Sequence, residues 1–285
     1  MPELPEVEIL VRHLAPLLPG RTVRGVRVNR TKSIRPTSVR QFRERLVGAK
    51  FLSVMRRAKY LLFEVKPPGR NARPFTLLGH LGMTGRMYLQ PARRPHPKHV
   101  AVVLELGREH FIFEDTRYFG RLTLDPTPLA TLGPEPLGNS FDGEQLHSGL
   151  RRSRQAIKLK LLDQSVVSGV GNIYASEALH RAHLSPCKAA GRLTRAQCES
   201  LVRALREILA EAIAAGSTVP LDFAGDGQRD GLFYYGRAKG APAGFEERLR
   251  VYNRVGEPCL DCGTPIRRIV QAARSTYYCP ACQRG

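Results

Sequence analysis

Several features that would place a protein in or beyond a membrane are absent from this sequence. It has no run of about 18 uncharged apolar residues, which excludes a transmembrane helix. Its first six residues are acidic, whereas a secretory signal peptide begins basic and then becomes apolar. Internal repeats and low-complexity tracts are also lacking. We therefore expect a soluble, cytoplasmic protein that does not act at a membrane.

Negative charge is scarce as well. The 285 residues include 45 Lys and Arg but only 25 Asp and Glu, which gives a formal net charge of +20. Only nine of the 45 are lysines, and the guanidinium of arginine suits bidentate contact with phosphate. This balance favours a polyanionic partner, most simply nucleic acid, although solubility or coding bias can also produce it. The apolar content of 42% excludes wholesale disorder, and the length allows two or three domains.

Cysteine is uncommon, but four of the six cysteines lie near the C-terminus. Cys259 and Cys262 form one CxxC pair, and Cys279 and Cys282 form another after 16 intervening residues. Each pair can chelate a metal from one tight turn, and the spacing is typical of a four-cysteine zinc site. Two disulfides are the alternative, but nothing else suggests an oxidising compartment. We predict one structural zinc ion, because four thiolates leave no open position for catalysis.

The apolar pattern indicates an N-terminal β-rich domain over residues 1–125. Residues 6–18 carry apolar side chains at helical spacing. Runs of β-branched and aromatic residues then predict strands, at 23–28, 51–65, 100–106 and 111–113. We expect a β-sandwich with one leading helix. Residues 126–145 begin with a stretch rich in proline and glycine and are expected to form a linker.

A helical pattern replaces the strand pattern over residues 146–249. Helices are predicted at 156–163 and 173–183, and a longer one begins at a capping box formed by Thr194 and Gln197. The glycine-rich residues 216–244 predict a mobile loop in this domain. The cysteines complete a zinc module over 250–285. The predicted fold class is therefore α+β with several domains.

The residues that follow Met1 have catalytic potential. Removal of Met1 would leave Pro2 with a free secondary amine, and an α-amine has a pKa of about 8, so part of it is unprotonated at neutral pH. Such an amine can attack a sugar carbon and form a Schiff base, which divides one difficult substitution into two steps. Glu3 could protonate the leaving group or the ring oxygen. Taken alone, the same residues are also a plain lead-in to a helix.

Six sequence motifs, in one order over essentially the whole chain, resemble those of bacterial formamidopyrimidine-DNA glycosylases. They are PELPEVE at 2–8, RRAKY at 56–60, GHLGMTG at 79–85, LGPEPL at 132–137, GVGNIYA at 169–175 and the four cysteines. The related endonuclease VIII group typically begins Pro-Glu-Gly-Pro instead. The resemblance implies a monomeric bifunctional enzyme that excises oxidised purines from duplex DNA and cleaves the abasic site. It also implies that the helical domain has the helix-two-turn-helix fold.

The resemblance assigns catalytic roles residue by residue. Pro2 would attack C1′ of the damaged nucleotide, and Glu3 would assist base loss and ring opening. Glu6 would support that pocket, and Lys59 would serve β-elimination. Arg274, at the tip of a hairpin between the two CxxC pairs, would grip phosphates and serve δ-elimination. Without the family, Lys59 is equally well explained as one more cation on a basic strand.

Three further residues would fill the duplex after the damaged nucleotide is flipped out, a step that costs a few kcal/mol. By resemblance Met83 and Phe119 are wedges, and Arg117 faces the orphaned cytosine. We expect Arg117 and Phe119 to lie on one side of an extended segment. The alternative for Met83 and Phe119 is ordinary core packing. Tyr118 stands where the family often has arginine or lysine, so we expect it to form a hydrogen bond in place of that cation.

The remaining expected DNA contacts also follow from the resemblance: His80, His99, Arg152, Arg154, Lys158, Asn172 and Tyr252. We prefer His99 to His96 because Val100 follows it in register. Asn172 is expected to cap a helix that begins at Ile173, where exposed N–H groups form an anion site. Tyr252 is usually followed by glycine, whereas here Asn253 follows it. A solvated run of charge is the alternative for Arg152 and Arg154.

Two other functions remain open at this point. A non-catalytic, zinc-dependent protein that binds DNA or recognises lesions would explain the charge and the cysteines, but not Pro2 and Glu3 together with Lys59. An endonuclease VIII-like preference for oxidised pyrimidines is the second. By resemblance, residues 216–244 would close over the flipped base, and a disordered surface insert is the alternative. They look longer than is usual in the family, which leaves the base preference open.

Overall fold

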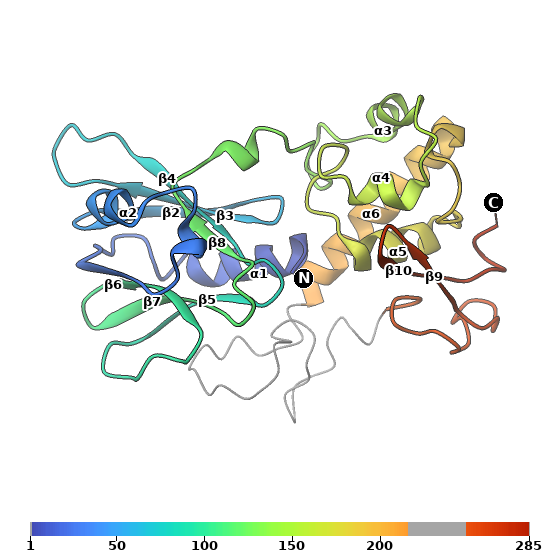
Figure 1. The fold of residues 1–285 in the computed structure, drawn as a ribbon. Coiled ribbons are helices and arrows are strands. Elements are labelled where there is room, and N and C mark those ends of the chain that lie inside the picture. Colours follow the sequence, from blue (N-terminus) through green and yellow to red (C-terminus); the bar gives the residue numbers. More distant parts are fainter. Residues whose placement is uncertain (1, 216–248, 285) are drawn as a thin grey trace. The chain divides into compact units, whose positions relative to one another are not determined.

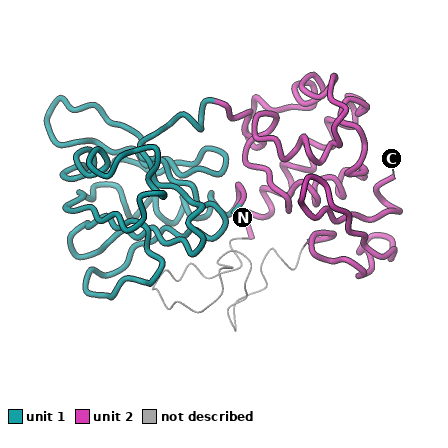
Figure 2. Tube along the Cα trace, in the orientation of Figure 1, with its two compact units in different colours: residues 1–2, 6–130, 217–242 teal, residues 3–5, 131–216, 243–285 magenta. Residues whose placement is uncertain are grey.

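The computed structural model describes residues 2–215 and 249–284, which form two compact units (Figures 1 and 2). Among these residues, the first unit holds 2 and 6–130, and the second holds 3–5, 131–215 and 249–284. The chain passes between them after Ala130, inside the expected linker. The whole of the predicted loop 216–244 lies outside the described residues. No helix in the described ranges is long and apolar enough to cross a membrane.

The first unit is built from two antiparallel four-stranded sheets (Figure 1). The first sheet has the order β1 (Gly25–Val28), β6 (Val100–Glu105), β7 (Glu109–Asp115) and β5 (Gly85–Pro91). The second has the order β2 (Lys50–Arg57), β3 (Tyr60–Lys66), β4 (Phe75–His80) and β8 (Arg121–Thr123). Three smaller elements accompany them: η1 (Thr31–Ile34), α2 (Val39–Leu46) and η2 (Thr127–Leu129).

Aromatic side chains from both sheets form the interior of the first unit. Burial alternates along β3, which points Phe63 inward. Its ring meets Phe111 of β7 edge-on, with centroids 5.5 Å apart, and Phe51 of β2 packs on both rings. The leading helix α1 (Leu4–Leu14) adds its buried apolar face, including Leu10, to the same core. The expected β-sandwich with a leading helix is confirmed.

The boundaries of two predicted elements in the first unit are wrong. The leading helix spans Leu4–Leu14 rather than 6–18, because Pro16 lacks an N–H for the helix ladder and disfavours helical backbone at the residue before it. The run 51–65 is two strands, not one, because the chain reverses at Ala58, which has a left-handed φ of 53°. The sequence did not predict strands β4, β5 and β8 or helix α2.

Within the described ranges, the second unit consists of three short α-helices, one 3-10 turn and one long helix, followed by a hairpin. Its helices are α3 (Gly143–Leu150), α4 (Ile157–Leu162), α5 (Asn172–Arg181), η3 (Ala190–Arg192) and α6 (Arg195–Ala215). Residues 143–145, expected to be linker, belong to α3. The capping box before α6 is confirmed, because Thr194 and Gln197 each donate a backbone N–H to the side chain of the other.

The C-terminal part of the second unit is a small β-hairpin. Strand β9 (Arg267–Gln271) pairs with β10 (Arg274–Tyr278) through a turn whose two central residues, Ala272 and Ala273, both have positive φ. The paired cysteines flank this hairpin, and Val251, Ile266, Cys259 and Cys279 form a small core beside it. The predicted helical domain and cysteine-flanked hairpin are therefore present.

Candidate active site and zinc centre

Glu3 binds the N-terminal end of helix α5. Its side chain is 2% exposed, and its two carboxylate oxygens accept the backbone N–H groups of Ile173, at 3.0 Å, and Tyr174, at 3.4 Å. A Cβ at Gly171 would lie 2.2 Å from the carboxyl carbon of Glu3, so only glycine leaves room for this contact. The helix dipole also favours negative charge at this end. Glu3 therefore performs the capping that sequence reasoning assigned to Asn172.

The segment that leads into α5 is also constrained by the N-terminal residues. Gly169 has a φ of +84°, which favours glycine, and a Cβ there would lie 2.7 Å from the side chain of Leu4. The Leu4 N–H donates to the Gly169 carbonyl at 3.1 Å. The GVGN segment thus has two glycines because the N-terminal residues of the chain lie against it.

The prediction that Asn172 caps a helix is wrong. Asn172 is the first residue of α5 itself, and its Nδ2 donates to the carbonyl of Ser275 on β10, at 2.9 Å. Its Oδ1 is buried and has no hydrogen-bond partner among the described residues. Sequence reasoning failed here because the true cap, Glu3, comes from the other end of the chain.

Lys158 of α4 is completely buried beside the same hairpin. Its Nζ donates to Thr276 Oγ1 at 2.7 Å and to the Ser275 carbonyl at 3.0 Å. Burial is the main cause that lowers the pKa of this ammonium to about 7; the charge of Glu3 opposes the shift and the positive charge of Arg274 adds to it. Arg274 itself is exposed on β10. The second unit therefore brings Glu3, Lys158, Asn172 and the start of β10 together.

Tyr252 is positioned by a buried carboxylate that sequence reasoning missed. Glu177 of α5 accepts the N–H groups of residues 250, 251 and 252 at 2.8–3.0 Å. Burial raises the pKa of Glu177, and these three hydrogen bonds oppose that effect. The Tyr252 ring packs on Tyr277. Asn253, with a φ of 61°, adopts the left-handed turn that the usual glycine would take.

In the first unit, Pro2, Glu6 and Lys59 are all buried. Lys59 directly follows the left-handed residue of the β2–β3 turn. His80, at the end of β4, packs on Tyr60 and accepts the N–H of Gly82 on Nδ1 at 3.1 Å. Burial and, to a smaller extent, the positive charges of Lys59 and Arg121 together lower the pKa of His80 to about 4. His80 is therefore neutral near pH 7.

Met83 and Phe119 are exposed, which excludes the core-packing alternative. Their side chains are 41% and 46% accessible. The two loops that carry them share one fully buried carboxylate, Asp115. Its oxygens accept the hydroxyl of Thr84, the N–H of Arg117 at 3.1 Å and the N–H of Gly120 at 2.7 Å. Asp115 therefore fixes both candidate wedges relative to each other.

The segment around Tyr118 is not extended as predicted, because Tyr118 has a φ of 52°. The Arg117 guanidinium nevertheless lies 4.9 Å from the centre of the Phe119 ring. The expected hydrogen bond of Tyr118 is present: its hydroxyl lies 3.4 Å from Nδ1 of His99. His96 instead pairs with His110 at 2.9 Å, so of the two candidate histidines only His99 reaches this loop.

Two cations beside this loop were not predicted. The Arg30 guanidinium lies 4.6 Å from the centre of the Tyr118 ring, and Lys32 Nζ lies 5.7 Å from that of Phe119. The sequence holds too many arginines for charge alone to identify them. Arg152 and Arg154 are exposed on the turn between α3 and α4. This exposure fits a phosphate contact and a solvated run of charge equally well.

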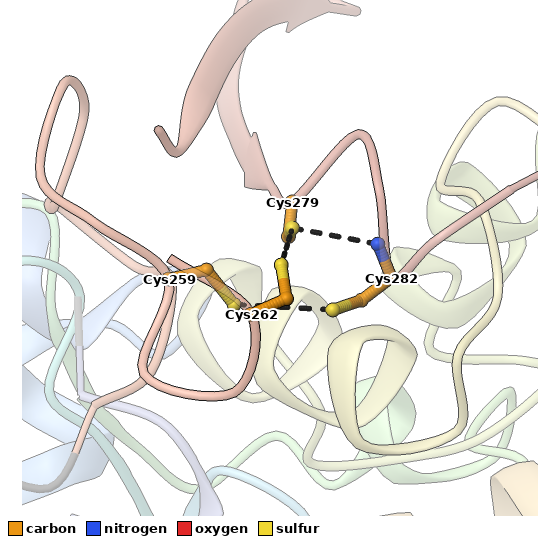
Figure 3. Close-up of side chains that lie close together, drawn as sticks. All are labelled: Cys259, Cys262, Cys279 and Cys282. Atoms are coloured by element: carbon orange, nitrogen blue, oxygen red, sulfur yellow. Dashed lines mark hydrogen bonds between the residues drawn. The ribbon is translucent and has the colours of Figure 1, made fainter. Parts of the chain in front are cut away.

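The four C-terminal cysteines converge as a metal site (Figure 3). The sulfurs of Cys259 and Cys282 lie 4.0 Å apart, and those of Cys262 and Cys279 lie 3.5 Å apart. Ligands about 2.3 Å from a tetrahedral zinc ion are separated by about 3.8 Å, whereas a disulfide requires about 2.05 Å. The cluster therefore fits one structural zinc ion, and the disulfide alternative is wrong.

Three family profiles match the chain in the same order as these parts. Residues 1–122 match the formamidopyrimidine-DNA glycosylase N-terminal domain, and residues 132–222 match the H2TH domain of that family. Residues 256–285 match the zinc finger found in FPG and IleRS.

Full-length relatives agree with these matches. A formamidopyrimidine-DNA glycosylase of Thioalkalivibrio sulfidiphilus is 44% identical over 292 residues, with 100% of both chains covered. Lactococcus lactis Fpg in complex with abasic-site DNA is 32% identical, with a TM-score of 0.85 over 99% of this chain and 100% of that one. A MutM structure in complex with DNA containing carbocyclic 8-oxo-G is 31% identical, with a TM-score of 0.85 and both chains fully covered.

The buried state of Lys158 predicts an unusual titration. In protein with lysines labelled with ¹³C at Cε, one resonance should pass its midpoint near pH 7, because burial disfavours the charged ammonium. The Lys158→Met variant should lose that resonance and keep the others. If every lysine resonance of the folded wild type titrated above pH 9, the described environment of Lys158 would be wrong.

Asp115→Asn should loosen the two wedge loops together. The new amide NH₂ would face the N–H donors, and a lost buried hydrogen bond costs about 1–3 kcal/mol. Amide hydrogen exchange at Gly120 should become at least about tenfold faster. Asp125→Asn is the matched control, because within the described part of the chain Asp125 accepts only local bonds from Thr127. Unchanged exchange at Gly120 would show that Asp115 does not hold the loop.

Proposed function

Because this chain belongs to the formamidopyrimidine-DNA glycosylase family, we propose that it excises formamidopyrimidines and 8-oxoguanine from duplex DNA and cleaves the resulting abasic site. We further propose that it acts as a monomer. The observation that carries the proposal is the binding of the Glu3 carboxylate to the N-terminus of α5. This contact fixes Glu3. Glu3 is bonded directly to Pro2, and Pro2 is the proposed nucleophile.

The proposed reaction begins with Pro2 as the first residue of the mature chain. Its nitrogen lone pair forms a bond to C1′ while the bond from C1′ to the base breaks. The base leaves with a proton taken from solvent, and Glu3 passes the proton released by the Pro2 nitrogen to the sugar ring oxygen as the ring opens. Ring opening yields an iminium ion between Pro2 and C1′. This ion acidifies C2′–H, so that loss of the proton expels the 3′ phosphate.

The abasic remnant then loses its second phosphate. A further proton is removed from the conjugated iminium, and the 5′ phosphate leaves, so that a one-nucleotide gap with phosphate ends remains. We assign the proton transfers of β-elimination to Lys59 and those of δ-elimination to Arg274. Glu6 supports the pocket. Zinc takes no part in these steps: the four cysteines would hold it as a brace for the hairpin that carries Arg274.

The described surfaces support a division of DNA contacts between the units. In the first unit, exposed Met83 and Phe119 would enter the vacated stack, and Arg117 would face the orphaned base. His99 would contact the backbone, and His80, being neutral, would contact it by hydrogen bonding alone. The second unit would bind phosphates through Arg152, Arg154, Asn172 and Tyr252. Lys158 is completely buried, so it would serve DNA binding by holding β10 through Thr276 and Ser275. These contacts would make binding strongly salt-dependent.

Borohydride trapping tests the proposal. Reduction of the iminium links enzyme and DNA covalently, so wild type should give a band on a duplex with 8-oxoguanine opposite cytosine. Pro2→Gly should weaken that band at least about tenfold, because the secondary amine that forms the iminium is lost. Lys59→Met is the matched control and should still trap, because it leaves Pro2 intact. Mass spectrometry of the intact protein confirms that Pro2 is the first residue.

Each contrary result points to a different alternative. A band that survives in Pro2→Gly but disappears in Lys59→Met would make Lys59 the nucleophile. Tight binding without any band would favour the non-catalytic DNA-binding protein. A band only on a duplex with an oxidised pyrimidine would indicate an endonuclease VIII-like preference.

A further inference from the structure

The last turn of helix α5 reaches the zinc cysteines through a buried histidine. His180 is 1% exposed, and its Nε2 lies 3.5 Å from the sulfur of Cys259. The same nitrogen lies 3.5 Å from a carboxylate oxygen of Asp261. Asp261 also accepts a hydrogen bond from the Arg250 guanidinium. All four residues belong to the second unit.

We propose that His180 is a positioning residue for the zinc centre, whose Nε2–H donates to the Cys259 thiolate from outside the coordination shell. The four cysteine sulfurs already complete a tetrahedron, so the histidine is not needed as a ligand. The separation of 3.5 Å between His180 Nε2 and Cys259 Sγ fits an N–H···S hydrogen bond. Two ligands of one zinc ion would lie at a similar separation, so the complete set of four sulfurs, and not this distance, places His180 outside the coordination shell. This proposal does not depend on the glycosylase activity.

The charge of the site explains why such a donor is useful. Four thiolates around one zinc ion leave a net charge of about −2, and two of the sulfurs belong to buried residues, Cys259 and Cys279. Donors of N–H···S hydrogen bonds disperse that charge and hold the ligands in place. Cys279 receives the backbone N–H of Cys282 at 3.4 Å. In the proposed arrangement, the sulfur of Cys259 instead accepts the Nε2–H of His180.

A direct ligand role is the competing explanation. His180, Cys259 and Asp261 bring their potential ligand atoms within 4.8 Å of one another, as the four cysteines also do. The two groups share Cys259, and Asp261 lies in the same turn, between Cys259 and Cys262. The four-cysteine set is the better zinc site, because it supplies four soft ligands in a closed shell.

The contact also docks the zinc turn on α5. Glu177 and His180 lie three residues apart and so share one face of the helix. Glu177 holds the backbone of residues 250–252, and His180 holds the first zinc cysteine. Two buried polar side chains thus tie α5 to the segment that leads into the hairpin. Loss of His180 should therefore weaken zinc retention while α5 keeps its other anchor.

Zinc release from the full chain tests the proposal. In His180→Phe, which keeps a ring but removes the donor, a chromogenic chelator should remove zinc about 10- to 100-fold faster than from wild type. His180→Gln retains an N–H and should recover part of the difference. His147→Phe, on α3 in the same unit, is the matched control and should release zinc like wild type. Equal release from His180→Phe and wild type would overturn the proposal.

A spectroscopic measurement on wild type removes any dependence on folding of the variants. In protein loaded with ¹¹³Cd, the Nε2–H proton of His180 should show a small coupling to cadmium through the hydrogen bond to sulfur. A large direct coupling between the His180 nitrogen and cadmium would make His180 a ligand and overturn the proposal. An Nε2–H proton without any coupling to cadmium would also overturn it.

Discussion

The contact between the Glu3 carboxylate and the first backbone N–H groups of helix α5 is the interaction on which the site depends. It joins the beginning of the chain to residues 173 and 174. Hydrogen bonds to a charged group contribute about 1.5–3 kcal/mol, and the helix dipole adds to them. Gly171 must lack a side chain for the carboxylate to fit. Because Pro2 is bonded directly to Glu3, a fixed Glu3 restricts where the proposed nucleophile can lie.

Helix α5 carries the rest of the second unit's site in successive turns. Asn172 at its start bonds to β10, Glu177 in its middle holds the backbone before and at Tyr252, and His180 near its end meets the zinc cysteines. Each of these side chains is polar, and each is bonded to a segment far away in the sequence. Buried polar side chains are costly without hydrogen bonds, and each of these three makes at least one, although Asn172 Oδ1 has no partner among the described residues. Helix α5 therefore positions β10, the backbone at Tyr252 and the first zinc cysteine.

The sequence predicted those features that depend on local spacing or on composition. The two CxxC pairs predicted the zinc site, the runs of β-branched and aromatic residues predicted the sandwich, and the Thr194–Gln197 pair predicted the start of α6. These signals are local because a turn, a strand period or a cap involves only a few residues. The end of helix α1 was predicted too late because Pro16 stops the helix early. The turn between β2 and β3 was not predicted because it depends on the left-handed backbone of Ala58.

Long-range contacts were beyond sequence reasoning. Asn172 looked like a cap because its neighbours fit the pattern, but Glu3 takes that place from 170 residues away. Glu177 and His180 looked like ordinary members of a helix, and only packing shows that they are buried. Nothing in the sequence distinguishes Arg30 from the other arginines, of which there are 36 in all. Only the fold shows that its guanidinium lies over the ring of Tyr118. The exposure of Met83 and Phe119 likewise depends on how two loops share Asp115.

Amide hydrogen exchange at Ile173 tests the central claim most directly. Glu3→Gln keeps the shape of the side chain but replaces one acceptor oxygen with a donor, so the Ile173 amide should exchange at least about tenfold faster than in wild type. Glu6→Gln, which changes another buried carboxyl of the same N-terminal segment, should leave Ile173 unaffected. If Glu3→Gln left the exchange of Ile173 and Tyr174 unchanged, the carboxylate would not be holding helix α5, and the account of the site would fail.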